Sequence, residues 1–559
     1  MAVGLTIKVL GTLAELMLPY ILSHILEDVI TREMRDILFW GGMMVVFAAV
    51  AAICNVIANR MAARVSRNFA EAMRRDLFAR TLRLSAAQTD AFTVPSLESR
   101  ITTDTYNVHH FVNMMQRLGV RAPIMLVGGI AITMFMDWRL SLVMVALLPL
   151  IFVSVYFVSK KGVPLYAQVQ KSVDGMVRVV REDAQGIRVI KALSKTDYEH
   201  RRYDTVNRAL SRDETRAGII MGITNPVMTL CMNIGSVAVI ALGAFCISGG
   251  VSSPETVVAF MQYFTLISMA MMSVTRMFVM YTKSSASARR IAEVLNAPED
   301  LAVQSKDVHP DTATDAHIVF DGVSFSYGGK KNDLSDISFA LPRGGHLGII
   351  GATGSGKSTL VKLLLRFYDV GKGGIYVGGE DVRTVEKRRF YAMFGSAMQQ
   401  DFLYADTVAE NIRFGRDISA DAIRTAAKIA QADGFITAFP DGYDHMLSPH
   451  GTNISGGQKQ RILIARAIAA RPEILILDDS SSALDYKTDA ALRKALAEHM
   501  ADTTVITVAQ RVSSVKDCDA VMVLDEGRII GMGTHEELLA SCAEYREISE
   551  SQMGGAFVE

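Results

Sequence analysis

The segment Gly351-Ala352-Thr353-Gly354-Ser355-Gly356-Lys357-Ser358 fits the pattern GxxxxGK(S/T) and decides how the C-terminal half of the chain folds. An apolar run, Leu347 to Ile350, comes directly before it, and a segment of helical pattern, Lys357 to Arg366, overlaps its end. Between a strand and a helix, the glycines let backbone N–H groups converge on phosphate oxygens. Lys357 can then reach the β- and γ-phosphates of a nucleotide, and Ser358 can ligate Mg²⁺. The segment therefore predicts a nucleotide-phosphate site in an α/β domain.

Short β-rich runs alternate with helical segments on both sides of this loop. The runs cover residues 318–320, 347–350, 474–477, 505–508 and 521–524, and helical segments include 357–366 and 458–470. This alternation is typical of an α/β domain, which we expect over residues 317–553. Asp478 follows the run Ile474 to Leu477, the arrangement that places a carboxylate beside the Mg²⁺ of a phosphate-binding loop.

A second anion site is predicted between these two motifs. Asn453-Ile454-Ser455-Gly456-Gly457-Gln458 heads a helix that stops before Pro472. Its small residues and the helix dipole would favour an anion at the helix N-terminus. Two anion sites in one domain require an explanation.

The N-terminal half has the composition of a membrane domain. Hydrophobic residues make up 50% of the chain, and they concentrate before residue 283. Lys+Arg and Asp+Glu are both 58, so no global charge excess favours a nucleic-acid partner. A spanning helix needs about 20 mostly apolar residues. Six spans are expected within a transmembrane domain of residues 1–283, at about 4–25, 37–59, 118–136, 140–159, 219–247 and 256–280, with Lys8 and Glu15 tolerated in the first.

Two connections between these spans, 60–121 and 160–216, are too long for structureless loops. We expect each to be a pair of helices, which at 1.5 Å per residue would project about 45 Å beyond the bilayer. Their many basic residues place both on the cytoplasmic side. Residues 284–316 are expected to be a helix end followed by a polar linker to the soluble domain. The five cysteines have no CxxC spacing, so they predict neither a zinc site nor a disulfide framework.

These motifs resemble those of the ATP-binding-cassette transporter superfamily, specifically half-size exporters, over nearly the whole chain. The resemblance implies an all-α six-helix transmembrane domain plus an α/β P-loop NTPase domain, in a multi-pass protein of the cell inner (plasma) membrane with its nucleotide-binding domain in the cytoplasm. It implies that Ser455, Gly456, Gly457 and Gln458 form the signature that closes over ATP held by a partner's phosphate loop, so a dimer is expected. Segments Ser85 to Asp90 and Lys195 to Glu199 resemble the coupling helices that touch the cassettes.

The resemblance also assigns site residues. Tyr327 would stack on adenine, with a plain surface aromatic as the alternative reading. Gln399 would sense Mg²⁺, and Ser482 to Asp485 would be the D-loop. The expected ATP ligands are Tyr327, Gly351, Thr353, Gly354, Ser355, Gly356, Lys357, Ser358, Thr359 and Gln399, and the expected Mg²⁺ ligands are Ser358, Gln399 and Asp478.

The sequence departs from the family at the two expected catalytic positions. Asp479 stands where a Glu orients the attacking water, and Gln510 stands where a His contacts the γ-phosphate. The Asp carboxylate would fall short by about 1.3–1.5 Å, and misplacements of about 1 Å can lower rates about a hundredfold. Ser448-Pro449-His450 also replaces the usual residues before the signature. We hypothesise a degenerate site that hydrolyses ATP slowly, within a heterodimer whose other site this signature completes.

Three functions remain open at this point. The first is ATP-driven export of a small amphipathic or hydrophobic molecule. The second is an ATP-gated or ATP-sensing membrane protein that does not pump. The third is an importer with exporter-type spans. Methionines of the last two spans could line an adaptable cavity, although such residues are more often ordinary packing. Arg276 is a stronger candidate for the cavity, unless it lies at the cytoplasmic rim.

Overall fold

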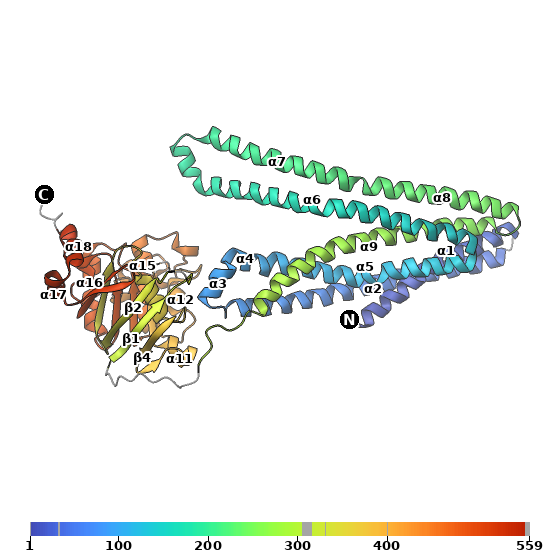
Figure 1. The fold of residues 1–559 in the computed structure, drawn as a ribbon. Helices are drawn as coiled ribbons and strands as arrows, with labels where there is room; N and C mark the ends of the chain where they lie inside the picture. The colour runs from blue at the N-terminus through green and yellow to red at the C-terminus, as the bar shows by residue number, and fades with distance from the viewer. Residues whose placement is uncertain (1, 32–33, 305–315, 330, 400, 554–559) are drawn as a thin grey trace. The chain divides into compact units, whose positions relative to one another are not determined.

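The computed structural model describes residues 2–31, 34–304, 316–329, 331–399 and 401–553, apart from some side chains within the helices. The chain divides into two compact units (Figure 1). The first comprises Met1–Arg83 and Thr93–Ala297, and the second comprises Leu84–Phe92 and Pro298–Glu559. A short stretch of the N-terminal half therefore belongs to the same unit as the C-terminal domain.

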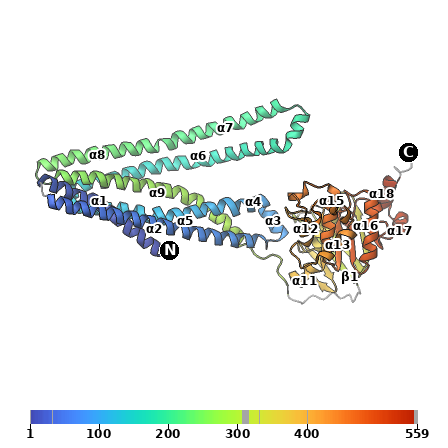
Figure 2. The same cartoon turned by 180° about the vertical axis from the view of Figure 1, so that it is seen from behind.

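The first unit contains helices and short turns, and no strand among its described residues. Its elements are α1 (Ala2–Thr31), α2 (Met34–Thr81), α4 (Val94–Ser99), the π-helical turn η1 (Arg100–Asp104), α5 (Thr105–Met136), α6 (Trp138–Ala192), α7 (Thr196–Gly222), α8 (Thr224–Ser248) and α9 (Pro254–Leu295). Helices α6 and α7 lie side by side in both views (Figures 1 and 2). The tight turn between α5 and α6 forms because the Asp137 carboxylate accepts the N–H groups of Arg139 and Leu140, capping α6.

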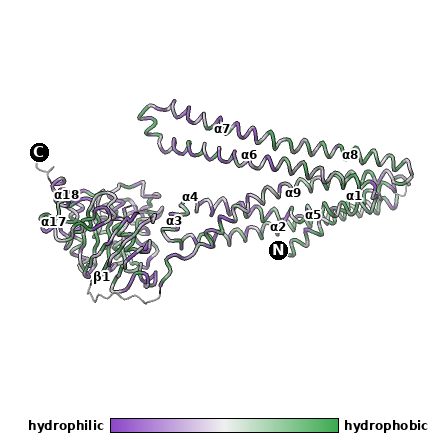
Figure 3. Tube along the Cα trace, viewed as in Figure 1, coloured by the Kyte–Doolittle hydropathy of each residue, from purple (hydrophilic) through white to green (hydrophobic). Residues whose placement is uncertain are grey.

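Five helical stretches among the described residues are long and apolar enough to cross a membrane. They are Ala2–Val29, Met34–Thr81, Val94–Met136, Thr229–Ser248 and Pro254–Val274. The span expected at 140–159 falls within α6, where several side chains lie outside the described part. Hydropathy differs between neighbouring helices: α8 is mainly hydrophobic, whereas α7, which ends at Gly222 just before it, is mainly hydrophilic (Figure 3). Helices thus continue through both of the long connections, 60–121 and 160–216.

The last helix of this unit, α9, extends into the region 284–316, where a helix end and a linker were expected. It continues to Leu295. Polar contacts with α5 explain this extension: the Ser284 hydroxyl donates to the Asn107 carbonyl at 2.9 Å, and the Asn107 amide donates to Ser287 at 3.1 Å. The helix therefore remains packed after its apolar residues end.

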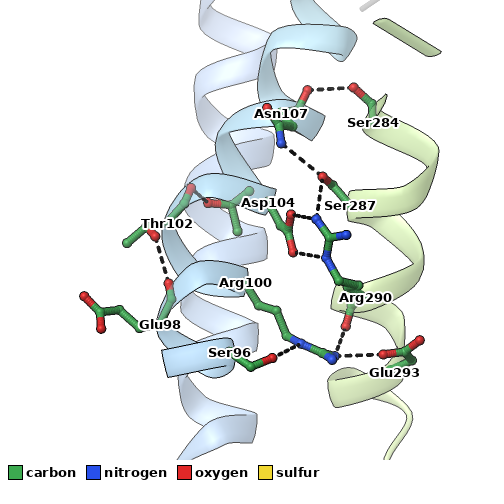
Figure 4. A network of polar contacts seen from close by, with 11 residues as sticks. Ser96, Glu98, Arg100, Thr102, Asp104, Asn107, Ser284, Ser287, Arg290 and Glu293 are labelled. Carbon is green, nitrogen blue, oxygen red and sulfur yellow. Dashed lines mark hydrogen bonds and ion pairs between the residues drawn. The ribbon is translucent and has the colours of Figure 1, made fainter. Parts of the chain in front are cut away.

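An ion-pair network continues this contact between η1 and α9 (Figure 4). Asp104 is fully buried, and both of its oxygens accept from the Arg290 guanidinium, one of them from Nε at 2.8 Å. Arg100, which is 8% exposed, donates to the Arg290 carbonyl and pairs with Glu293 at 3.0 Å. The wider π-helical turn begins at Arg100 and ends at Asp104. Single π-helical turns of this kind are often found at functional positions.

The second unit contains two sheets. The strands are β1 (Ala316–Phe325), β2 (Leu334–Pro342), β3 (His346–Gly351), β4 (Lys372–Val377), β5 (Glu380–Asp381), β6 (Phe394–Ala397), β7 (Ile474–Asp478), β8 (Thr504–Val508), β9 (Ala520–Asp525) and β10 (Arg528–Gly533). A four-stranded antiparallel sheet has the order β2-β1-β4-β5, and a six-stranded sheet has the order β10-β9-β3-β8-β7-β6. The six-stranded sheet is parallel except at β10.

Helices cover both faces of the six-stranded sheet. They are α10 (Lys357–Leu364), α11 (Lys387–Ala392), α12 (Val408–Arg413), α13 (Ala420–Ile429), α14 (Asp433–Ile436), α15 (Gly456–Ile468), α16 (Tyr486–His499), α17 (His535–Ser541) and α18 (Ala543–Met553). Figure 2 shows α13, α15 and α16 in front of the strands. Along β7, Ile474 and Ile476 enter one apolar core whereas Leu475 and Leu477 enter another. Such a strand, buried on both faces, is typical of a parallel sheet.

Helix α3 (Ala86–Phe92) packs within this second unit although its sequence lies in the N-terminal half. The Ser85 hydroxyl donates to Asp300 at 2.6 Å, and the Gln88 amide donates to the Pro298 carbonyl at 2.7 Å. The Tyr368 hydroxyl donates to the Asp90 carboxylate. The segment expected to touch the nucleotide-binding domain, Ser85 to Asp90, therefore does so. The other such segment, Lys195 to Glu199, lies at the turn between α6 and α7.

Candidate functional site

The sheet order gathers three motifs at one edge. Strand β3 lies beside β8, and β8 lies beside β7, with Ile349 and Asp478 both opposite Val508. Because the carboxyl ends of parallel strands meet at the same edge of a sheet, the loops that follow these strands converge there. A cavity of about 690 Å³ lies at this edge. The predicted site residues that line it are Thr353, Gly354, Ser355, Gly356, Lys357, Ser358, Thr359, Gln399, Asp478, Asp479 and Gln510.

The loop between β3 and α10 has the backbone that a phosphate cradle requires. Gly354 and Gly356 have φ angles of 86° and 102°, which favour glycine. A Cβ at Gly356 would lie 2.6 Å from a Leu334 methyl carbon, whereas a Cβ at Gly354 would meet no atom within 4 Å. Lys357 Nζ donates to the carbonyls of Gly351 and Ala352 at 2.9 and 2.8 Å. An ammonium and a helix N-terminus thus face the open side of the cradle, a donor set that fits a nucleotide triphosphate.

The candidate metal position lies where β7 ends. The Asp478 side chain is buried, and burial raises the pKa of its carboxyl, while a hydrogen bond from Ser358 opposes that shift. Within the described ranges, no group of three His, Cys, Asp or Glu side chains is arranged to hold a metal ion. Mg²⁺ commonly takes one or two carboxylates together with substrate phosphates and water. Asp478, with the Ser358 hydroxyl and the Gln399 amide, therefore fits Mg²⁺ shared with a nucleotide.

Asp479 is held by both of the glutamines that face it. Its Oδ2 accepts from Gln510 Nε2 at 2.9 Å and from Gln399 Nε2 at 3.2 Å. Burial raises the pKa of Asp479, and the two amide hydrogen bonds oppose this shift. The residue has a φ of 51°, in the left-handed region. The two expected catalytic positions, Asp479 and Gln510, are therefore direct partners in one hydrogen-bonded group.

Tyr327 lies beside the cavity, not among the residues that line it. Its side chain is exposed, and its hydroxyl donates to Thr359, a lining residue, at 3.4 Å. The ring packs edge-on against Phe325 at 4.9 Å and against Tyr368 at 5.1 Å. Sequence reasoning missed Tyr368, whose hydroxyl joins this aromatic group to Asp90 of α3. The sequence feature that could have pointed to Tyr368 is the aromatic pair Phe367-Tyr368, which follows the helix of the phosphate loop.

The signature residues stand apart from this cavity: none of Ser455 to Gln458 is among its lining residues in the part of the chain that is described. Ser455 is the N-cap of α15 and forms a capping box with Gln458. Gln460 of α15 donates to the Ser482 hydroxyl at 3.2 Å and accepts from the Ala483 N–H at 3.0 Å. The signature helix is thereby fixed to the predicted D-loop.

The last D-loop residue, Asp485, has a structural role in this chain. Its carboxylate caps α16 by accepting from the Thr488 N–H at 2.9 Å and the Thr488 hydroxyl at 2.8 Å. These bonds lower the pKa of Asp485. His450, one of the unusual residues before the signature, packs its ring against Phe402 with centroids 4.3 Å apart.

The sequence similarity of this chain to known proteins extends over both units. Residues 1–271 match the family model described as ABC transporter transmembrane region, and residues 334–482 match the one described as ABC transporter. An uncharacterized ABC transporter ATP-binding protein of Mycobacterium tuberculosis is 34% identical over 563 residues, which cover 100% of this chain and 96% of the relative. The uncharacterized ABC transporter ATP-binding protein YfiB of Bacillus subtilis is 33% identical over 543 residues, covering 97% and 94%.

A solved structure has the same fold. The structure of a bacterial Atm1-family ABC exporter with ATP bound matches with a TM-score of 0.84 at 23% identity, covering 100% of this chain and 98% of that chain. The two family models and this match agree on a helical transmembrane region followed by an α/β nucleotide-binding domain in a single chain.

Proposed function

Because the chain belongs to the ABC transporter family, we propose that it is one half of an ATP-driven exporter that pairs with a second half-transporter. The observation that carries the proposal is the cavity at the edge of the six-stranded sheet, where the phosphate loop meets Asp478 and Gln399. The exporter-type helices of the first unit would provide the path across the membrane. ATP would close two cassettes, and the helices would pass that motion to the spans by alternating access.

In this proposal each site residue has a specific task. The backbone of Thr353 to Gly356, with Lys357 and Thr359, binds the phosphates, and Tyr327 stacks on adenine. Ser358, Gln399 and Asp478 would hold Mg²⁺, which neutralises charge on the β- and γ-phosphates when it is bound. Ser455 to Gln458 would face the partner's nucleotide, which agrees with their position outside the cavity of their own chain.

We further propose that this chain's own site hydrolyses ATP slowly. The supporting observation is that Asp479 Oδ2 already accepts from two neutral amides, Gln510 and Gln399. A carboxylate shortened by one methylene would hold the attacking water poorly. A neutral amide at position 510 cannot supply the charge of an imidazolium. Such a site gains most from a different partner whose own catalytic residues are complete, so a heterodimer is favoured.

An ATP-gated membrane protein without pumping is the second candidate, favoured by the same Asp479–Gln510 contact. Inside-out vesicles that contain the assembled transporter separate the two. Export predicts ATP-dependent accumulation of an amphipathic dye against its gradient, and Lys357→Ala in this chain should reduce it. Equal dye concentrations on both sides at steady state, reached faster with ATP, would favour a gated pathway. Accumulation in vesicles oriented with their cassettes inside would instead indicate an importer.

A further inference from the structure

Charged side chains of α1 and α5 lie within helical stretches of the first unit that are apolar enough to span a membrane. Lys8 and Glu15 belong to α1, and Arg117 and Arg121 belong to α5. At 1.5 Å per residue, Glu15 and Arg121 lie about 20–25 Å along their helices from Val29 and Asp137, within a hydrocarbon core of about 30 Å. Charged side chains at such a depth face the interior of the helix bundle or water, and they mark functional paths.

Glu15 and Arg121 form an ion pair between the two helices. Arg121 Nη2 donates to Glu15 Oε1, and the two side chains are 38% and 21% exposed, respectively. The second oxygen of Glu15 is buried without a hydrogen-bond partner among the described residues. The carboxylate therefore binds Arg121 through one oxygen, so an anion of better geometry can compete for the guanidinium, which presents several N–H donors in a planar fork.

Lys8 adds a second positive charge at this place. It is 4% exposed, and its ammonium donates to the amide oxygens of Asn55 at 2.6 Å and Asn59 at 3.3 Å. No carboxylate among the residues that the structure describes forms an ion pair with it. Lys8 lies seven residues before Glu15, so the two residues lie two turns apart on one face of α1. Lys8 and Arg121 thus provide two cations for one carboxylate, which leaves a surplus of positive charge.

Apolar surface lies directly beside this cluster. Arg121 borders a cavity of about 50 Å³ whose other walls include Met125 of α5 and Leu266, Met269 and Ser273 of α9. Methionine side chains adapt to apolar groups of different shapes. A cationic site next to an adaptable apolar wall matches a molecule with one anionic group on an apolar body.

We propose that Lys8 and Arg121 bind the anionic headgroup, a carboxylate or a phosphate, of the amphipathic molecule that the transporter moves. This inference rests on the proposed function and deepens it, because it assigns the charge of the substrate. Glu15 occupies part of the site in the empty state and is displaced from Arg121 when the headgroup binds. The phosphate of a resident membrane lipid has the same chemistry, so the test must separate a lipid that only binds from a molecule that is moved.

The test uses the assembled transporter in vesicles of zwitterionic lipid and three tail-labelled probes with similar apolar bodies. These probes are lysophosphatidate, lysophosphatidylcholine and sphingosine, which carry an anionic, a zwitterionic and a cationic headgroup. We expect ATP-dependent movement of lysophosphatidate in preference to the other two. Stimulation of ATP hydrolysis by lysophosphatidate without its movement would identify a lipid-binding site and overturn the assignment to the substrate. Equal movement of all three probes would also overturn it, yet would leave ATP-driven transport itself intact.

Variants that should change lysophosphatidate binding in opposite directions make the test more specific. Arg121→Gln and Lys8→Met should each weaken lysophosphatidate binding about tenfold, because each removes a charged hydrogen-bond donor. Glu15→Gln should strengthen binding, because the competing carboxylate is lost. Arg139→Gln, which removes a cation at the other end of the spans, is the matched control and should not change the preference.

If Arg121→Gln fails to assemble because Glu15 is left unpaired, the double variant Glu15→Gln/Arg121→Gln removes both charges and should still lose the preference. A Glu15→Gln variant that weakens lysophosphatidate binding as much as Arg121→Gln does would contradict the proposal. That result would show the ion pair to be purely structural.

Discussion

At the scale of single residues, the proposal of slow ATP hydrolysis depends mainly on Asp479. Its Oδ2 accepts from Gln510 at 2.9 Å and from Gln399 at 3.2 Å, so both amides hold the carboxylate. The residues proposed to hold phosphates and Mg²⁺ line the same cavity. Under this proposal, nucleotide binding and ATP hydrolysis would depend on different residues of one site.

Replacing Asp479 by Glu and Gln510 by His should raise the rate of ATP hydrolysis at this chain's own site. In Asp479→Glu/Gln510→His the carboxylate reaches about 1.5 Å farther and the facing residue can be charged, so we expect ATP turnover at this site to rise about a hundredfold. The measurement is steady-state ATP hydrolysis by the assembled transporter whose partner site has lost its P-loop lysine. Asp479→Asn/Gln510→His, which has no carboxylate, is the matched control. Unchanged turnover in the restored variant would contradict the role given to Asp479.

Asp478 predicts a dependence of nucleotide binding on pH. Burial raises the pKa of its carboxyl above the ordinary 3.8, and the carboxylate must be ionised to ligate Mg²⁺. As pH falls below that raised pKa, Mg²⁺-dependent ATP affinity should drop about tenfold per pH unit, since one proton is taken up. Titration calorimetry with and without Mg²⁺ at a series of pH values measures this. An affinity that stays constant with pH down to 3.8 would contradict it.

The same group gives a stability prediction of known sign. A carboxyl whose pKa is raised by folding stabilises the fold below its unfolded pKa, and this contribution is lost as pH rises through the folded pKa. Asp478→Asn should therefore raise the melting temperature of the nucleotide-free protein at neutral pH while it removes the Mg²⁺ dependence of ATP binding. A lower melting temperature would show that Asp478 is stabilised in some other way.

At the scale of elements, the contact between η1 and α9 joins two helices that are far apart in the sequence. Asp104 is fully buried and Arg290 is half exposed, and they meet through two hydrogen bonds (Figure 4). Asp104→Ala should destabilise the first unit by about 1–3 kcal/mol, because the Arg290 guanidinium loses its buried anionic partner. Thermal unfolding in a fixed detergent measures this loss.

The surface pair Asp204 and Arg208 provides the control for that experiment. Their side chains are 39% and 79% exposed and lie four residues apart on α7. Asp204→Ala should change stability by about 0.5 kcal/mol or less, as is usual for exposed helical pairs. Equal losses of stability in Asp204→Ala and Asp104→Ala would show that the η1–α9 contact stabilises the protein no more than an exposed ion pair does.

Tyr368 provides a second prediction at this scale, because it links the aromatic group around Tyr327 to α3. Burial and the neighbouring Asp90 carboxylate raise the pKa of its phenol, so the hydroxyl stays protonated and donates. Tyr368→Phe keeps the ring and removes only this bond, which is worth about 1.5–3 kcal/mol for a charged acceptor. We expect nearly unchanged ATP affinity but less transport per ATP hydrolysed. A proportional loss of both would show that Tyr368 acts through nucleotide binding.

The elements that follow local rules could be predicted, and those that depend on distant contacts could not. The strand, loop and helix around Gly351 to Ser358 were predictable because glycine spacing and apolar periodicity are local features of the sequence. The exact end of α9 was not predicted, because Ser284 and Ser287 contact Asn107 on another helix. Tyr368 was missed for the same reason, since its partner Asp90 lies far away in the sequence, on a segment of the N-terminal half that folds into the same unit as Tyr368.

At the scale of the whole molecule, one chain combines a helical unit with apolar spans and an α/β unit with one nucleotide cavity. The signature residues do not line that cavity in the described part of the chain, so they are available to a second cassette. We propose that hydrolysis of ATP at the partner's site drives this transporter, whereas the ATP bound at this chain's own site remains largely unhydrolysed.

The most direct test measures what becomes of the nucleotide on this chain during turnover. The assembled transporter would be incubated with azido-ATP radiolabelled at the γ-phosphate, crosslinked by light, and its two chains separated. We expect the label to remain on this chain, at a level that Lys357→Ala abolishes, and the partner to lose its γ-label as it hydrolyses ATP. Equal loss of the γ-label from both chains at the rate of turnover would contradict the account, because this chain's site would then be fully catalytic.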